Sequence, residues 1–228
     1  MGHTAPLNAR RRLLFAGGLL ACYGITAAGR AFAAGSAGAM HDHHQHDQMA
    51  AGAHDQHQHA EVPAGVKRSE AMYKIPALTM VRQDGAKVAF PQELDSGGPV
   101  MLAFIYTSCT TVCPVTSQVF SEVQEQLGKE RGKLRMYSIS IDTEYDTPAR
   151  LREYAKKFHA GQQWQHYTGT QEASISVQKA FDVYRGDKMN HFPVTFLRAA
   201  PGKSWIRLEG FASPGLLAKE YRDLVKMG

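Results

Sequence analysis

A continuous apolar segment followed at once by two cysteines is the feature that most limits how this chain can fold. Residues 99–106, PVMLAFIY, contain no charged side chain, a pattern typical of a β-strand covered on both faces. The next stretch, YTSCTTVCP over residues 106–114, leads into residues 115–127, whose apolar side chains have helical spacing. We therefore expect Cys109 and Cys113 where a buried strand ends and a helix begins, the edge at which open α/β sheets hold ligands.

The rest of the chain after residue 65 alternates between strand and helix patterns. Asp146, Thr147 and Pro148 have the character of a helix start, and we assign Asp146 to capping that helix. The order of elements predicts the α/β class, as a thioredoxin-like sandwich with a central mixed sheet flanked by helices. The expected elements are a hairpin over 78–90, strands over 99–106 and 134–141, helices over 115–127, from 148 and over 172–184, a hairpin of strands over 192–197 and 204–211, and a last helix from 213.

Residues 1–33 have the features of an export signal peptide. Three arginines at residues 10–12 precede an apolar stretch over residues 13–28, and Ala-Phe-Ala at residues 31–33 matches the small-x-small pattern of a cleavage site. The segment that ends at Cys22 also resembles a lipoprotein cleavage site, so a lipid anchor is the alternative to plain cleavage. Both signals predict a domain that works outside the cytoplasm, in a periplasm or its equivalent, and the second predicts a membrane tether.

Residues 34–64 differ sharply in composition, because they hold seven of the chain's eleven histidines among Asp, Gln, Ala and Gly. A segment without apolar periodicity cannot bury enough surface to fold alone, so we expect a disordered, His- and Met-rich linker. Imidazole and thioether groups bind copper, and imidazole also binds zinc and nickel. We favour metal capture over a passive spacer as its role. The histidines concerned are His41, His43, His44, His46, His54, His57 and His59.

The folded domain is expected over residues 65–228. The chain's formal net charge of +5 is modest, and the arginines at residues 10–12 supply part of it. Lys and Arg side chains interleaved with aromatic ones would indicate a nucleic-acid partner, and the sequence has no such stripe. No nucleic-acid partner is therefore expected.

The spacing of the two cysteines predicts a chelate. Residues at i and i+4 lie on the same side of a helical turn, and the free N–H groups of a helix start lower thiol pKa values. Two soft sulfur donors favour Cu(I), with Cu(II) as the alternative, and the same pair could close to a disulfide. His191 is the candidate third ligand because it precedes a strand expected beside the cysteine loop, and a purely structural histidine is the alternative interpretation of this position. His159 and His166 are more simply explained as surface or packing residues.

Three motifs together resemble the Sco/SenC family of copper-binding assembly proteins. They are YTSCTTVCP, SISIDTEYDTP over residues 138–148 and MNHFPVTFL over residues 189–197. The similarity in spacing extends over almost all of residues 65–228. It implies a thioredoxin fold, independently of the order of strands and helices described above.

The resemblance also implies a site and a function. Copper would be bound by Cys109, Cys113 and His191, and the protein would deliver copper, or thiol-reducing power, to the CuA site of a cytochrome oxidase subunit or a similar cuproenzyme. A thiol reductase is then a further expected partner, and Asp142 is an outer-shell candidate. A metallochaperone of this kind exchanges ligands and needs no turnover chemistry, so we do not expect an enzyme.

The chain departs from the family pattern at three positions. Thr110 follows the first cysteine where the family commonly has proline, and Phe192 and Pro193 follow the histidine where it commonly has a small hydroxyl residue. Pro193 resembles the proline that thioredoxins place opposite their cysteines, so a thiol–disulfide oxidoreductase that uses Cys109 and Cys113 stays the alternative. The stretch before Cys109 lacks the proline and threonine spacing of a peroxiredoxin, which makes a peroxidatic role the weakest of the three.

Overall fold

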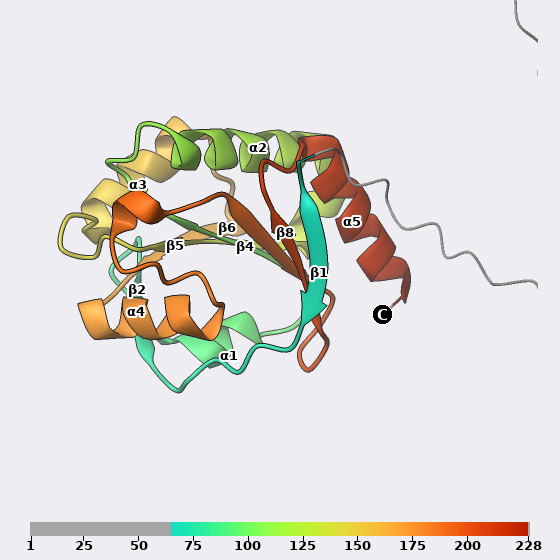
Figure 1. Ribbon diagram of the computed structural model, residues 1–228. Helices are drawn as coiled ribbons and strands as arrows, with labels where there is room; N and C mark the ends of the chain where they lie inside the picture. The colour runs from blue at the N-terminus through green and yellow to red at the C-terminus, as the bar shows by residue number, and fades with distance from the viewer. Residues whose placement is uncertain (1–64, 228) are drawn as a thin grey trace, which may run out of the picture. The chain divides into compact units, whose positions relative to one another are not determined.

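One mixed β-sheet of eight strands organises the computed structural model, which describes residues 65–227 (Figure 1). The strand order is β1-β8-β7-β4-β5-β6-β2-β3; β5 runs parallel to β4 and to β6, and the other neighbours are antiparallel. The expected export signal, Cys22 and the expected histidine-rich linker lie outside the described residues. The strands are β1 (Lys67–Ala71), β2 (Thr79–Arg82), β3 (Lys87–Ala89), β4 (Val100–Ile105), β5 (Arg135–Ser140), β6 (Trp164–Thr168), β7 (Val194–Arg198) and β8 (Trp205–Glu209).

Helices cover both faces of this sheet. Figure 1 shows α2 and α3 above the strands and α1 and α4 below them, and α5 packs beside α2 at the β1 end of the sheet. Two short 3₁₀ helices, η1 and η2, complete the set. The helical elements are α1 (Phe90–Leu94), α2 (Val112–Leu127), η1 (Gly128–Lys133), α3 (Pro148–Lys157), α4 (Gln171–Ala180), η2 (Lys188–Asn190) and α5 (Pro214–Met227).

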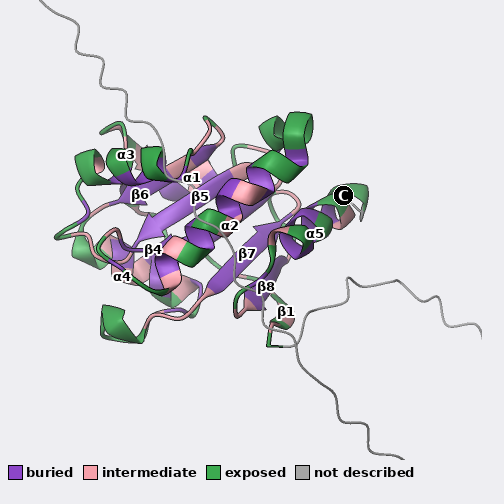
Figure 2. Ribbon diagram, turned by 90° about the horizontal axis from the view of Figure 1, so that it is seen from above, coloured by how far each residue is buried: buried purple, intermediate pink, exposed green. Residues whose placement is uncertain are grey.

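Strand β4 lies near the middle of the sheet, and all six of its residues are buried, as the apolar run at residues 99–106 predicts (Figure 2). Successive side chains of a strand point to opposite faces, so β4 contributes to both apolar cores. Met101, Ala103 and Ile105 pack in the core under α2, α3 and α5. The alternate residues Val100, Leu102 and Phe104 pack in the core over α1 and α4.

Aromatic side chains fill the second core and anchor the end of α4. The Phe181 ring lies 5.7 Å from that of Phe104, 4.9 Å from that of Phe196 and 5.1 Å from that of Trp205, measured between ring centroids. Tilted and edge-to-face pairs of this kind contribute beyond the area that they bury. They fix the point from which residues 182–193 return to β7.

The predicted α/β sandwich is confirmed, with differences at the ends of elements. Helix α2 begins at Val112, so Cys113 lies inside its first turn, and α4 ends at Ala180 rather than continuing to Tyr184. Strand β1 was not predicted; it pairs with β8 along the sheet edge. None of the helices within residues 65–227 combines the length and the apolar character that spanning a bilayer requires.

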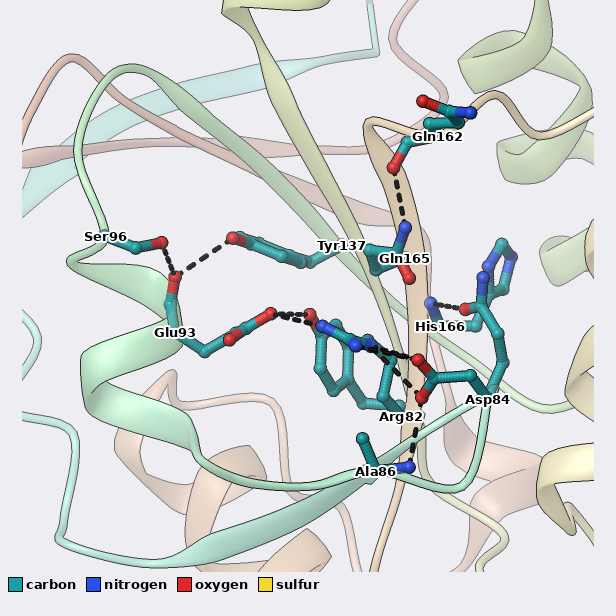
Figure 3. A network of polar contacts seen from close by, with 11 residues as sticks. Arg82, Asp84, Ala86, Glu93, Ser96, Tyr137, Gln162, Gln165 and His166 are labelled. Carbon is teal, nitrogen blue, oxygen red and sulfur yellow. Dashed lines mark hydrogen bonds and ion pairs between the residues drawn. The ribbon is translucent and has the colours of Figure 1, made fainter.

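A polar network connects the β2–β3 hairpin, which forms the end of the sheet opposite β1, to helix α1 (Figure 3). The Arg82 guanidinium contacts the Asp84 carboxylate at 2.7 Å and the Glu93 carboxylate at 3.4 Å. The Tyr137 hydroxyl donates to the Glu93 carbonyl at 3.1 Å. Arg82 ends β2 and Glu93 lies in α1, eleven residues further along the chain, so these contacts hold the hairpin against α1.

His166 is the one fully buried histidine among the described residues, and it belongs to the packing of β6. Its ring stacks on that of Trp164, with centroids 5.2 Å apart, and neither ring nitrogen has a hydrogen-bond partner within residues 65–227. Burial lowers the pKa of His166 to about 3, because the charged imidazolium would lose its hydration. Its expected role as a packing residue fits this environment, and it is not placed to bind a metal.

We expect His166 to make the fold sensitive to acid. Between pH 6.5 and about 3 the unfolded chain binds a proton at this residue and the folded chain does not, so stability falls as the pH drops. At pH 5 the cost is about 2 kcal/mol relative to pH 7.5. Urea unfolding at both pH values should show this loss in the unmodified protein and a loss smaller by about that amount in His166→Phe. Equal losses in the two proteins would contradict the assignment.

Candidate metal centre

Cys109 and Cys113 lie together at the start of α2, directly after β4. The backbone N–H of Cys113 donates to Cys109 Sγ at 3.4 Å, and the backbone N–H of Tyr106 donates to Cys113 Sγ at the same distance. Both cysteines are buried and both are free thiols. The predicted juxtaposition of the two sulfurs on one turn is therefore present, although Cys109 itself precedes the helix.

The two thiols differ in acidity. Burial works to raise the pKa of Cys109, but the backbone N–H groups of Cys113 and Thr111, together with a side-chain hydrogen bond from Tyr106, bring it down to about 7. Burial raises the pKa of Cys113, and the neighbouring Cys109 raises it further. The expectation that the helix start lowers both thiol pKa values is wrong for Cys113, because loss of hydration outweighs its contact with the Tyr106 N–H.

Asp146 is a buried carboxylate that holds the cysteine loop, and its assignment to helix capping is wrong. It accepts hydrogen bonds from the Thr107 backbone N–H at 3.1 Å, from the Thr107 hydroxyl, and from the Ser140 hydroxyl at 2.7 Å. The cap of α3 is Thr147, whose side chain accepts from the Arg150 N–H. Burial raises the pKa of Asp146, which these hydrogen bonds oppose.

His191 lies at the entry to β7 and faces the end of β4. The β4–β7 ladder ends at the pair Ala103–Thr195. The next carbonyl along β4, that of Phe104, is 3.0 Å from His191 Nε2. The His191 ring also meets the Tyr106 ring edge-on, with centroids 6.4 Å apart. The histidine therefore lies beside the end of β4, the strand that leads into the cysteine loop.

The structure does not join His191 to the two sulfurs as a formed metal site. Within residues 65–227 no group of three or more His, Cys, Asp or Glu side chains is arranged to hold an ion. The ligand set Cys109, Cys113 and His191 therefore stays a prediction, with the paired sulfurs as its assembled part. The predicted metal-capturing histidines, from His41 to His59, lie outside the described residues.

The segment before His191 is tied to the loop after β5. Lys188 Nζ lies 2.6 Å from Asp142 Oδ2 and sits over the Tyr106 ring, 5.7 Å from its centroid. Asp142, the outer-shell candidate, is thus bound to η2 rather than to a thiol. The exposed His159 has left-handed backbone geometry after α3, in keeping with a surface residue.

Tyr106 is the site residue that sequence reasoning did not single out. Its backbone N–H contacts Cys113, its side chain contacts Cys109, and its ring contacts His191. One sequence feature could have identified Tyr106: it is the last residue of the apolar run and lies three residues before Cys109. Burial and the nearby Cys109 raise the pKa of Tyr106 to about 12, so its hydroxyl stays protonated at neutral pH.

The unequal thiols predict unequal alkylation. The rate at Cys109 should rise with pH and level off above pH 7, since its pKa is about 7, whereas Cys113 should stay unreactive through pH 9. Peptide mass spectrometry after pulsed iodoacetamide treatment measures each site separately. Cys113→Ala retains the backbone N–H that contacts Cys109 but removes the thiol that also contacts it, so the Cys109 profile should move above pH 7 without reaching pH 9. A midpoint near pH 9 in both proteins would contradict the assigned hydrogen bonds.

The distinct roles of Asp146 and Thr147 predict distinct costs of mutation. Asp146→Ala leaves the Thr107 and Ser140 donors without their acceptor and should lower the free energy of unfolding by about 3 kcal/mol. Thr147→Ala removes only an exposed cap and should cost about 1 kcal/mol. Urea unfolding of both variants decides between the assignments, because a capping role for Asp146 would make the two losses similar.

Known proteins resemble this chain mainly over the residues that the structure describes. The sequence matches the family described as SCO1/SenC over residues 67–226. It is 33% identical over 106 residues to the SCO1 protein homolog of Bacillus subtilis, an alignment that covers 45% of this chain and 53% of that protein. The chain thus spans about half the length of the curated relatives that it matches.

Solved structures show the same fold at low identity. ScoI of Bradyrhizobium japonicum, determined with copper bound, has a TM-score of 0.55 and 24% identity, covering 64% of this chain and 96% of that one. BsSco, described as having a disulfide switch and as a member of the Sco family of cytochrome c oxidase assembly proteins, has a TM-score of 0.58 and 23% identity, covering 68% and 95%. The fold is therefore the thioredoxin-like fold of Sco proteins, and the chain belongs to the SCO1/SenC family.

Proposed function

We propose that this protein is an extracytoplasmic copper chaperone that holds Cu(I) and yields it to the CuA site of a cytochrome c oxidase subunit or to a similar cuproenzyme. The observation that carries the proposal is the pair of free thiols at the start of α2, with the Cys113 N–H 3.4 Å from Cys109 Sγ. Two further facts support it: the chain belongs to the SCO1/SenC family, and B. japonicum ScoI was solved with copper bound.

The donor set suits Cu(I). Thiolate sulfur is the soft ligand that Cu(I) prefers, and Cys109 is largely ionised slightly above neutral pH because its pKa is about 7. Cys113 keeps its proton until the cargo binds and releases it then, so uptake of one Cu(I) frees at least one proton. Both cysteines belong to the apolar core under α2, α3 and α5.

His191 has the protonation state that a ligand needs. The Phe104 carbonyl can only accept a hydrogen bond, so Nε2 must donate to it, and Nδ1 of the neutral ring then carries a free lone pair. Burial lowers the pKa of His191, which favours this neutral form. We assign Nδ1 as the third donor, oriented by the Phe104 carbonyl in the way that outer-shell groups orient metal-bound histidines.

Transfer would proceed by ligand exchange. A donor atom of the acceptor protein binds Cu(I) while one of the three ligands leaves, and the oxidation state of the copper does not change. A site with three ligands leaves a coordination position through which the acceptor can approach. Residues 1–33 would act as an export signal that directs the domain out of the cytoplasm. Residues 34–64 would capture metal there and supply it to the domain.

A thiol–disulfide oxidoreductase is the second candidate, and the unequal thiols favour it. Cys109, with a pKa of about 7, suits an attacking thiolate, and Cys113, with a raised pKa, suits a buried resolving thiol. The disulfide switch described for BsSco is consistent with such chemistry. This candidate has no need of His191, so the histidine separates the two functions.

We expect Cu(I) affinity to depend on all three ligands. Residues 65–228 contain both apolar cores and are expressed alone, so that the linker histidines cannot mask the site. Competition with a chromophoric Cu(I) chelator should show one tightly bound Cu(I) in the reduced domain. Cys109→Ala and Cys113→Ala should each weaken binding by more than about a hundredfold, since losing a ligand costs more than losing an outer-shell partner.

The histidine variant decides between the candidates. His191→Ala should weaken binding by about tenfold or more, whereas His159→Ala, a matched change at an exposed histidine, should leave it unchanged. Full affinity in either cysteine variant would overturn the copper site. Unchanged affinity in His191→Ala would leave a dithiol site and make the oxidoreductase the better account.

A further inference from the structure

Met189 is the most exposed of the large apolar side chains among the described residues. Its side chain has a relative exposure of 73%. A flexible apolar group held in water gains nothing from burial, so packing does not explain its position in η2. Its thioether sulfur is, however, a soft and neutral donor of the kind that binds Cu(I).

The Met189 sulfur lies at the rim of the cysteine site. It is 3.9 Å from the Tyr106 hydroxyl. Tyr106 is the residue whose backbone N–H contacts Cys113 Sγ and whose side chain contacts Cys109. Tyr106 thus contacts the Met189 thioether and both thiols. Its ring also meets that of His191, which lies two residues after Met189 in the chain.

The position of Met189 is fixed by its neighbours rather than by its own packing. Its backbone N–H donates to Asp187 Oδ1 at 2.8 Å, which caps η2. The adjacent Lys188 binds Asp142 at 2.6 Å and lies over the Tyr106 ring. Short, charge-assisted contacts at the two preceding residues therefore fix the backbone beside Tyr106, while the Met189 side chain stays exposed.

We propose that the Met189 thioether is a transient Cu(I) ligand through which the cargo enters and leaves the Cys109–Cys113 pair. This inference rests on the proposed copper site. On entry a Cu(I)–Sδ bond forms as the donor's ligand leaves; Cu(I)–Sγ bonds to Cys109 and Cys113 then replace it, and thiol protons pass to water. Copper stays Cu(I) throughout, and release follows the same steps in reverse.

A ligand used only in passing changes rates more than affinities. Met189→Leu removes the sulfur and keeps the size of an apolar side chain. It should slow copper release about tenfold, equivalent to about 1.4 kcal/mol of activation free energy, while the equilibrium affinity changes by less than about threefold. Met72, exposed to 68%, provides the matched control, and Met72→Leu should change neither quantity.

The test uses the full chain in three forms, unmodified, Met189→Leu and Met72→Leu. Each is reduced, loaded with Cu(I), and mixed with an excess of bathocuproine disulfonate, which also removes copper from the histidines of residues 34–64. Samples are quenched with iodoacetamide, and peptide mass spectrometry follows the loss of protection at Cys109, the reactive thiol of the pair. The chelator concentration that exposes half of the thiols at equilibrium gives the affinity.

The outcomes separate this inference from the proposed function. Slower deprotection in Met189→Leu alone, with unchanged equilibrium, supports the transient ligand. Protected thiols that are released equally fast in all three proteins overturn the inference and leave the chaperone intact, as does equal slowing in Met72→Leu. An affinity loss as large as the rate effect makes Met189 a resident ligand and overturns the transient role. Thiols that copper never protects overturn the proposed function and this inference together.

Discussion

The buried Asp146 carboxylate is the interaction on which the site depends. It connects the end of β4, through Thr107, to the end of β5, through Ser140, and it sits one residue before the cap of α3. The ends of β4 and β5 and the start of α3 are thereby fixed around one group. The cysteine loop begins two residues after Thr107, so this contact fixes the point from which the loop starts. The buried carboxyl is stabilised because donors from both strands form hydrogen bonds with it.

The sheet topology then sets the position of His191, the candidate third ligand. Antiparallel pairing of β7 with β4 brings residue 191 beside residue 104, although 87 residues separate them in the chain. The ladder between these strands ends at Ala103–Thr195, and the carbonyl of the next β4 residue, Phe104, contacts the imidazole instead of continuing the ladder.

The sequence predicted the order of the elements and the position of the cysteines, because both are recorded in local apolar patterns. Strand β1 was missed because KRSEA has no apolar alternation; it is a strand only because β8 offers an edge. Asp146 was misassigned for a related reason, since capping preferences are local whereas burial depends on how β4, β5 and α3 meet. The acidity of Cys113 likewise could not be predicted, because a helix start lowers a thiol pKa only where burial does not outweigh it.

The unequal thiols fit both copper binding and dithiol exchange, so their acidity cannot by itself identify the chemistry. The imidazole is more informative. A dithiol exchange requires an attacking and a leaving sulfur, and neither step uses a neutral histidine whose proton is fixed on Nε2. A soft metal site can use one, because the neutral imidazole keeps a lone pair on Nδ1 that is available as a donor. The carbonyl of Phe104 selects that tautomer from within strand β4, the strand that leads directly into the cysteine loop, so the arrangement favours a protein that carries copper over one that only exchanges disulfides.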